Sequence, residues 1–307
     1  MNLFHTTNYK IYNKNLSKNL RIVIISDLHF SNLINDPKLN KISKKLNELK
    51  PDYILFPGDI IDSLNEIENN NDFDRLLSWI KNLDTIVLFS LGGHDFYKKD
   101  TSNWKYQDPS KLVKGINALP NSYILDNTKY EDEYLFVTGY TQSMEYYNYP
   151  NNTSSIFHPI KENKNLLSKE IKELNKKIKS IPKNKISFLL AHSPVYFLDN
   201  DIQKEIKDYN YIVSGHMHNG CVPPILYEIW NSKRGIIAPC KELFPNNERN
   251  TLKKINDKLI VNGPLTMFHG KILKLFNSFY PHYITIIDFT NNTKYKDKLI
   301  IKKSYNK

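Results

Sequence analysis

The sequence of 307 residues is poor in cysteine and glycine and has no long apolar run. Its two cysteines, Cys221 and Cys240, form at most one disulfide, which excludes a small disulfide-held scaffold and favours a reducing compartment. No stretch reaches the roughly 18 consecutive apolar residues of a spanning helix, so no transmembrane segment is expected. The polar first residues lack the apolar core of a secretory signal, and we expect a cytoplasmic protein.

Positive charge is not gathered in one block, although the formal net charge is +11. The lysines are scattered or lie on predicted helix faces, as in 41–45 and 169–177, without interleaved aromatic residues. The charge pattern therefore does not favour nucleic acid as a partner, but it leaves that partner open. The segment 267–280 mixes lysine with leucine and phenylalanine, which leaves two alternatives: a helix covering a sheet or a peripheral contact with a membrane.

Short β-branched and aromatic runs alternate with amphipathic patterns along the chain. Arg21–Ser26 is nearly continuous in isoleucine and valine, which predicts a strand buried on both faces. Leu39, Ile42, Leu46 and Leu49 step by three or four residues, which predicts a helix. On these criteria we expect strands at 21–26, 53–56, 85–91, 134–138, 186–190, 211–214, 283–289 and 298–301, and helices at 37–49, 72–83 and 163–181.

The β-α-β-α-β order predicts an α/β fold with right-handed crossovers and a partly parallel sheet. The polar pair Asn291-Asn292 between the last two strands predicts a hairpin. Segments 103–121 and 148–160 lack strand character, and we expect them to be loops that pass over the site. Because no linker is present, we expect one domain over 1–307, with core motifs in 21–220 and C-terminal strands in 221–307.

Glycine and histidine gather where the predicted strands end, with five of the ten glycines and five of the nine histidines there. In open α/β sheets, ligands bind just beyond the carboxyl ends of the strands. Two aspartates and four histidines offer oxygen and nitrogen donors that suit Mn, Fe or Zn and are too rich in nitrogen for Ca or Mg. The motifs are Asp27-Leu28-His29, Gly58-Asp59 with Asp62, Gly92-Gly93-His94-Asp95, His192 and Gly215-His216-Met217-His218.

Taken in this order, the motifs resemble those of the calcineurin-like metallophosphoesterases, and the region 215–220 is most similar to the bacterial branch of small phosphohydrolases. The resemblance implies a four-layer α/β/β/α sandwich of mixed sheets around two divalent metal ions. It implies metal-dependent hydrolysis of a phosphate ester or anhydride. The implied metal ligands are Asp27, His29, Asp59, His192, His216 and His218, with Asp59 bridging the two metals.

The third motif carries the implied catalytic residues. His94 would be the general acid that protonates the leaving oxygen, and Asp95 would orient it. Asp62 would fix a ligand or a loop. Four tyrosines lie close together in the sequence, at 140, 146, 147 and 149. Two interpretations are equally open: they line a substrate groove, or they belong to a loop that packs on the surface.

The chain departs from the family at Gly93, where the usual residue is an asparagine that binds the second metal. Three interpretations stay open: another donor such as Asn219 or Ser193, a weak second site, or lost activity. The sequence therefore predicts a phosphoesterase acting on a phosphodiester, phosphomonoester or pyrophosphate of a lipid, nucleotide or other small molecule. The alternatives are a non-catalytic metal- and phosphate-binding relative and a nuclease recruited by the positive surface.

Overall fold

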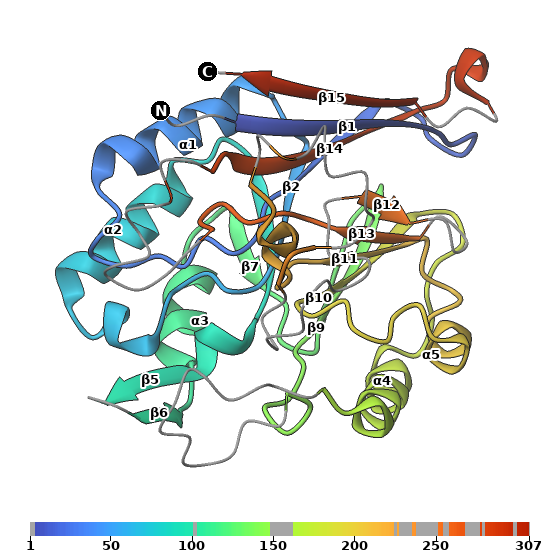
Figure 1. The fold of residues 1–307 in the computed structure, drawn as a ribbon. Helices are drawn as coiled ribbons and strands as arrows, with labels where there is room; N and C mark the ends of the chain where they lie inside the picture. Colours follow the sequence, from blue (N-terminus) through green and yellow to red (C-terminus); the bar gives the residue numbers. More distant parts are fainter. Residues whose placement is uncertain are drawn as a thin grey trace.

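The predicted α/β alternation forms two β-sheets that lie face to face with helices outside them (Figure 1). The structure is a computed structural model, and it describes residues 4–100, 103–147, 162–223, 226, 235–237, 251–253, 258–267, 277, 280–296 and 300–306. Both sheets mix parallel and antiparallel strands, as the expected fold class requires.

The first sheet has seven strands in the order β15-β1-β14-β2-β3-β4-β7. Neighbours from β2 to β7 are parallel, whereas β14 runs antiparallel to β2. The strands are β1 (Phe4–Tyr12), β2 (Leu20–Ile24), β3 (Tyr53–Pro57), β4 (Ile86–Ser90), β7 (Ser122–Ile124), β14 (His282–Thr290) and β15 (Ile300–Asn306).

The second sheet has six strands in the order β12-β13-β11-β10-β9-β8. Its four central strands are parallel, and the two edge strands are antiparallel to their neighbours. The strands are β8 (Lys129–Glu131), β9 (Leu135–Tyr140), β10 (Ile186–Ala191), β11 (Tyr211–Ser214), β12 (Thr251–Lys253) and β13 (Leu259–Val261).

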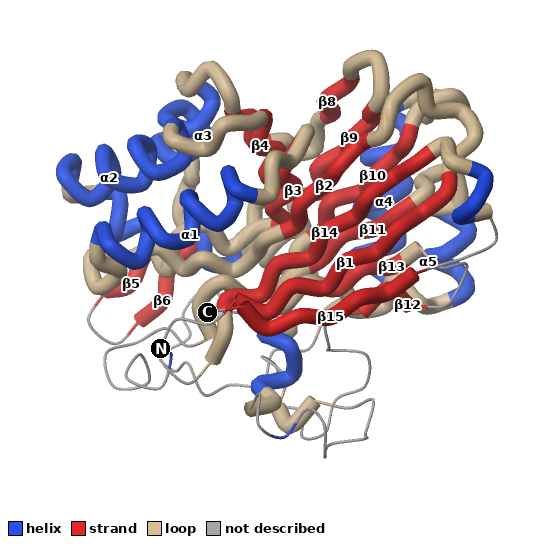
Figure 2. The backbone as a smooth tube through the Cα atoms, turned by 90° about the horizontal axis from the view of Figure 1, so that it is seen from above, coloured by secondary structure: helices blue, strands red, loops and turns tan. Residues whose placement is uncertain are grey.

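Alternating residues of β2 explain the layering, because side chains of a strand point to opposite faces. Ile22 and Ile24 pack between the sheets, whereas Val23 packs toward the outer helices. Figure 2 shows helices on both sides of the two sheets, with α1, α2 and α3 on one side and α4 and α5 on the other. They are α1 (Asp36–Glu48), α2 (Asn70–Lys81) and α3 (Ser110–Asn117), and then α4 (Lys164–Ile178) and α5 (Asn200–Glu205).

The predicted hairpin of the last two strands is wrong. β1 lies between β14 and β15, parallel to the first and antiparallel to the second. The connection from Thr290 to Ile300 is long enough to cross the roughly 10 Å between strands two positions apart. The N-terminal segment is polar in composition, yet it contains the β-formers threonine and tyrosine and places Tyr9 in the core between the sheets.

The segment 103–121 is also more regular than expected. Its first residues form β6 (Asn103–Tyr106), which pairs with β5 (Tyr97–Asp100) in a small hairpin. Its remainder forms α3, whose Leu112 and Ile116 are buried against the first sheet. The amphipathic spacing of these two residues was the missed signal. The segment 148–160 lies outside the described residues.

None of the helices in the described ranges is both long enough and apolar enough to cross a membrane. Most of the segment 267–280, for which a peripheral membrane contact was left open, lies outside the described residues.

Replacing Lys50 by glycine is expected to stabilise the protein by about 0.5–1 kcal/mol. Lys50 follows the C-terminus of α1 with φ of +48°, in the left-handed region that glycine adopts without strain, and it is exposed. Urea unfolding would measure the change. Lys50→Ala removes the same charge but keeps the strain, so it should give no gain. An equal gain in both variants would contradict the backbone explanation.

Candidate metal centre

Five strands deliver the predicted site residues to one place. Asp27 and His29 follow β2, Asp59 follows β3, and His192 follows β10. Two further histidines follow β11, and His94 lies in the single-turn helix η2 (Gly93–Phe96) after β4. Because the carboxyl ends of parallel strands meet at one edge of each sheet, the stacked sheets bring all these segments together. The structure therefore gathers every residue that was predicted to bind a metal.

The predicted ligands form two groups of potential metal donors. In each group the donor atoms lie within 4.8 Å of one another. We call Asp27, His29 and His218 the first ligand group, and Asp59, His192 and His216 the second ligand group.

Asp59 connects the two ligand groups. Its Oδ2 lies 3.0 Å from His192 Nε2 and 3.7 Å from His29 Nε2. Within the first ligand group, His29 Nε2 lies 3.1 Å from His218 Nε2. Asp27 Oδ1 lies 3.6 Å from His218 Nε2 and 4.0 Å from His192 Nε2. This arrangement suits two neighbouring cations with Asp59 between them.

The backbone at the site adopts conformations that are uncommon for residues with side chains. Five of the six residues in the ligand groups have φ between +45° and +67°, in the left-handed region. Such strain persists only where the surrounding structure imposes it, and it is typical of functional sites. These residues are Asp27, His29, Asp59, His216 and His218.

Two glycines allow the ligand segments to approach closely. A Cβ atom added to Gly92 would lie 2.3 Å from Asp59 Oδ1, and one added to Gly215 would lie 2.4 Å from Asp27 Oδ2. Both separations are too short for any real contact, so a side chain at either position would displace a carboxylate of the site.

The electrostatics of Asp59, His218 and Asp27 also fit bound cations. Burial tends to raise the pKa of Asp59, but the neighbouring charges of His192, His94 and His29 hold that pKa well below its usual range. Burial lowers the pKa of His218, which favours the neutral imidazole that binds metals. Asp27 Oδ2 is buried and has no hydrogen-bond donor in the described ranges, a state that is costly unless a cation compensates it.

Two imidazoles of the site are held by backbone carbonyls through Nδ1, which leaves Nε2 for a metal. His192 Nδ1 lies 2.8 Å from the Pro57 carbonyl, and His218 Nδ1 lies 2.6 Å from the Met267 carbonyl. Metal-binding histidines in proteins are commonly oriented in this way.

His94 lies beside the first ligand group, with its ring centre 4.6 Å from that of His29. Its Nδ1 is 2.7 Å from the backbone carbonyl of Asp62 and 3.8 Å from a carboxylate oxygen of the same residue. That carboxylate oxygen also lies 4.0 Å from His29 Nδ1. Asp62 therefore lies where the sequence suggested, in contact with both a metal ligand and the proposed acid.

Asp95 has a different place from the expected one. We expected it to orient His94, but its carboxylate accepts hydrogen bonds from the backbone amides of Asp59, Ile60, Ile61 and Gly92. It therefore fixes the loop that carries Asp59, and the carbonyl of Asp62 is a group that holds the His94 ring. Burial and the Asp59 charge raise the pKa of Asp95 to about 7, while the amides of Gly92 and Ile61 oppose that rise.

Replacing Asp95 by asparagine is expected to destabilise the protein by about 3 kcal/mol at pH 8. An amide has one acceptor oxygen, so two of the four backbone amides would face an NH₂ group instead. Urea unfolding measures the loss, with Asp74→Asn on the exposed face of α2 as the matched control. Equal stability of the two variants would contradict the role of Asp95 in holding the loop.

Gly93 leaves the second ligand group with three residues, and the structure shows what surrounds them. Ser193 Oγ, one of the expected substitutes, lies 3.3 Å from Tyr146 Oη and accepts a hydrogen bond from the amide of Val195. Asn219, the other, is buried in a left-handed turn. Sequence reasoning missed Glu162, whose Oε1 lies 3.5 Å from His216 Nε2.

Three of the four tyrosines for which a surface loop was an alternative are described, and none of these three is exposed. Tyr140, Tyr146 and Tyr147 are buried, and the Tyr147 ring centre lies 5.5 Å from that of His216. Tyr147 Oη donates a hydrogen bond to Gln142, which in turn binds the backbone of Ser193. Tyr147 therefore packs against the second ligand group through His216, and Tyr149 lies outside the described residues.

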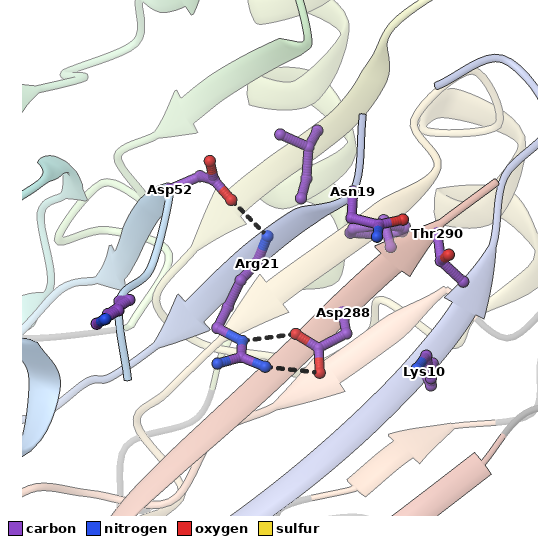
Figure 3. A pocket seen from close by; sticks show the side chains of 9 residues that line it. Lys10, Asn19, Arg21, Asp52, Asp288 and Thr290 are labelled. Carbon is purple, nitrogen blue, oxygen red and sulfur yellow. Dashed lines mark hydrogen bonds and ion pairs between the residues drawn. The ribbon is translucent and has the colours of Figure 1, made fainter. Parts of the chain in front are cut away.

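A separate pocket of about 300 Å³ lies at the opposite ends of the strands (Figure 3). Arg21 there binds both carboxylate oxygens of Asp288 at 2.7 and 3.2 Å, and its backbone amide donates to Asp52. The charge of Arg21 is thus already paired with that of Asp288. We interpret the side chains of this pocket as a cluster that stabilises the pairing of β2 with β14.

The motif order, the strand ends and the paired ligand groups agree with one family of sequences. The sequence profile described as calcineurin-like phosphoesterase matches residues 20–220 of this chain. The chain belongs to the calcineurin-like phosphoesterase family. The resemblance is therefore confirmed, and so is the expected α/β fold class with mixed sheets. The match covers all six residues of the two ligand groups together with His94.

This calcineurin-like phosphoesterase chain is similar to several curated proteins. It is 21% identical over 215 residues to an uncharacterized metallophosphoesterase of Campylobacter jejuni, covering 69% of this chain and 48% of that protein. It is 39% identical over 77 residues to UDP-2,3-diacylglucosamine pyrophosphatase LpxG of Chlamydia muridarum, covering 25% and 23%. The chain thus spans about half the length, or less, of the curated relatives it matches.

Among solved structures, a dimetal phosphatase from Danio rerio aligns with 92% of this chain and 95% of its own, at 11% identity and a TM-score of 0.45. Relatives also include a Danio rerio transmembrane protein with a metallophosphoesterase domain, 33% identical over 109 residues, which cover 34% of this chain and 22% of that protein.

Proposed function

We propose that this chain is a metal-dependent phosphoesterase that hydrolyses a phosphate ester or anhydride. The observation that carries the proposal is the position of Asp59, whose Oδ2 is within 4 Å of a histidine from each ligand group. Two bound cations, for which Mn²⁺ is our first choice, would polarise the phosphoryl group and lower the pKa of a water molecule.

His94 is the residue we assign to proton transfer. The carbonyl of Asp62 can only accept a hydrogen bond, so the proton of a neutral His94 lies on Nδ1 while that contact is kept. As the general acid, His94 would hold a second proton on Nε2 and pass it to the leaving oxygen, which leaves a neutral ring with its remaining proton on Nδ1. The backbone amide of His94 donates to Asp59 Oδ1 at 2.9 Å, which fixes the acid relative to the second ligand group.

We propose a phosphodiester or pyrophosphate of a lipid or nucleotide as the substrate. The net charge of +11 favours anionic substrates, and LpxG is named as a pyrophosphatase of an acylated sugar nucleotide. The cytoplasmic location and the peripheral membrane contact remain predictions. A nuclease would differ by a steep loss of substrate binding with added salt.

Turnover of bis-p-nitrophenyl phosphate across a Mn²⁺ titration tests the proposal. Hydrolysis that rises with Mn²⁺ and disappears with a chelator supports it. Three substrates are tested: this diester, p-nitrophenyl phosphate and a nucleoside diphosphate sugar. If none of them shows metal-dependent turnover, the result favours the non-catalytic alternative, which Gly93 specifically suggests.

A further inference from the structure

The hairpin of β5 and β6 lies next to the residue that we assign to proton transfer. β5 begins at Tyr97, three residues after His94. The ring centres of Tyr97 and His94 lie 6.1 Å apart, with the two rings perpendicular. A general acid contacts the leaving oxygen, so the rest of the leaving group lies on the His94 side of the phosphoryl group. The hairpin, which stands outside the two sheets below α3 in Figure 1, is therefore the described segment that follows the acid toward the leaving group.

Tyr106 is the residue of the hairpin that lies opposite Tyr97. The two are paired across the antiparallel strands, and paired residues point to the same face with their Cβ atoms about 5 Å apart. Tyr97 is buried, whereas Tyr106 is 55% exposed, the highest value among the exposed large apolar side chains of the described ranges. With increasing distance from the acid, this face of the hairpin thus carries first a buried and then an exposed tyrosine ring.

The Tyr106 ring is held in one orientation by Phe96. The two rings are nearly parallel, with an angle of 11° and centres 5.5 Å apart, and Phe96 itself belongs to the hydrophobic core. The amide of Gln107 donates to the carbonyl of Phe96 at 2.8 Å, and Lys98 forms an ion pair with Glu68. Phe96 covers one face of the Tyr106 ring, and the exposure of that ring leaves its other face for a ligand.

The Tyr106 hydroxyl lies in a negative environment. Partial burial and the charges of Glu145, Asp108 and Asp126 raise the pKa of Tyr106, so the ring is a neutral phenol near neutral pH. The same carboxylates would repel a leaving group that carries a negative charge of its own. A neutral leaving group with a flat ring fits this surface, because an aromatic face stacks with planar rings.

We propose that Tyr106 is a specificity residue that stacks with a planar aromatic ring in the leaving group of the substrate. A nucleoside and an alcohol with an aryl substituent both supply such a ring. The inference rests on the proposed function, since it assumes hydrolysis with His94 on the side of the leaving oxygen. It deepens that function by specifying a neutral leaving group that carries a ring.

Two diesters with similar leaving alcohols test the stacking: benzyl methyl phosphate and cyclohexylmethyl methyl phosphate. Their leaving groups have the same number of carbons, but only the benzyl ring is planar. With Mn²⁺, we expect the kcat/KM of the wild type to be at least about fivefold higher for the benzyl ester, the lower end of the range for stacking on an aromatic side chain. The products should be benzyl alcohol and methyl phosphate, which would put the ring on the side of the leaving group.

Substitutions of Tyr106 assign the preference to its ring. Tyr106→Leu should abolish the preference, because leucine keeps an apolar contact with Phe96 but has no aromatic face, whereas Tyr106→Trp should keep it. The matched control is Tyr123→Leu, which removes another exposed tyrosine ring, on β7, and should keep the wild-type preference. Circular dichroism and calorimetric binding of Mn²⁺ show whether each variant retains its fold and its metal centre. Should Tyr106→Leu not fold, Tyr106→Met is judged by the same criterion.

A third substrate identifies the source of the ring. Uridine 5′-methyl phosphate carries a nucleoside on the same methyl phosphate. Release of uridine with a kcat/KM at least about fivefold lower in Tyr106→Leu would support stacking with a nucleoside. A preference for the benzyl ester without release of uridine would support stacking with an aryl alcohol.

Three results would overturn the inference. The wild type hydrolyses the benzyl and cyclohexylmethyl esters equally, it releases methanol and benzyl phosphate, or a folded Tyr106→Leu protein keeps the wild-type preference. If neither ester is turned over, their affinities are compared as competitors of bis-p-nitrophenyl phosphate, and equal affinities overturn the inference. All of these results leave the proposed function intact, whereas the proposed function itself fails only if no ester shows metal-dependent turnover.

Discussion

Replacing Asp59 by asparagine is expected to lower turnover of a phosphodiester by about a thousandfold or more. Asp59 Oδ2 lies between the two ligand groups, 3.0 Å from His192 and 3.7 Å from His29. Asparagine keeps the shape but loses the charge that a bridging ligand needs. Loss of metal stabilisation worth several kcal/mol corresponds to a rate loss of this order, since about 1.4 kcal/mol is a factor of ten.

Steady-state hydrolysis of bis-p-nitrophenyl phosphate at saturating Mn²⁺ measures the loss, and metal analysis after dialysis measures retained ions. The control is Asp84→Asn, an exposed carboxylate in the turn before β4, which should behave as the wild type. An Asp59→Asn protein with wild-type turnover and unchanged metal content would refute the assignment of both ligand groups.

His94→Gln is expected to reduce hydrolysis of an alkyl phosphoester by about a hundredfold to ten-thousandfold, the range typical of a lost general acid. An alkoxide leaves poorly without a proton, whereas p-nitrophenolate leaves readily. We therefore expect the loss with a p-nitrophenyl ester to be at least about tenfold smaller. The substitution keeps the backbone amide that donates to Asp59, so Mn²⁺ affinity should stay near the wild-type value.

The comparison of the two esters separates an acid from a structural residue. Misplacement of Asp59 would slow both esters alike and would weaken Mn²⁺ binding. Equal losses with the two esters, at unchanged Mn²⁺ affinity, would exclude His94 as the proton donor and point to a role in binding the phosphoryl group.

Local sequence patterns predicted most of the elements that carry the site. The expected strands at 21–26, 53–56 and 186–190 correspond to β2, β3 and β10 within a few residues. Buried parallel strands consist of continuous apolar runs, and such runs are visible without any knowledge of the partner strands. The pairing of β1 was not predictable in this way, because its neighbours lie almost 300 residues away in the chain.

The sequence by itself determined the kinds of donor, their order and their attachment to strand ends, because the motifs are short and each spans a single turn. Only the tertiary structure decided what surrounds them. Asp95 holds the Asp59 loop through backbone amides, a role that no side-chain pattern encodes. Glu162 stands in no motif, and it reaches His216 only because the segment before α4 packs against the buried tyrosines. Contacts between distant segments depend on how the two sheets stack. The spacing of residues within a short motif does not predict that stacking.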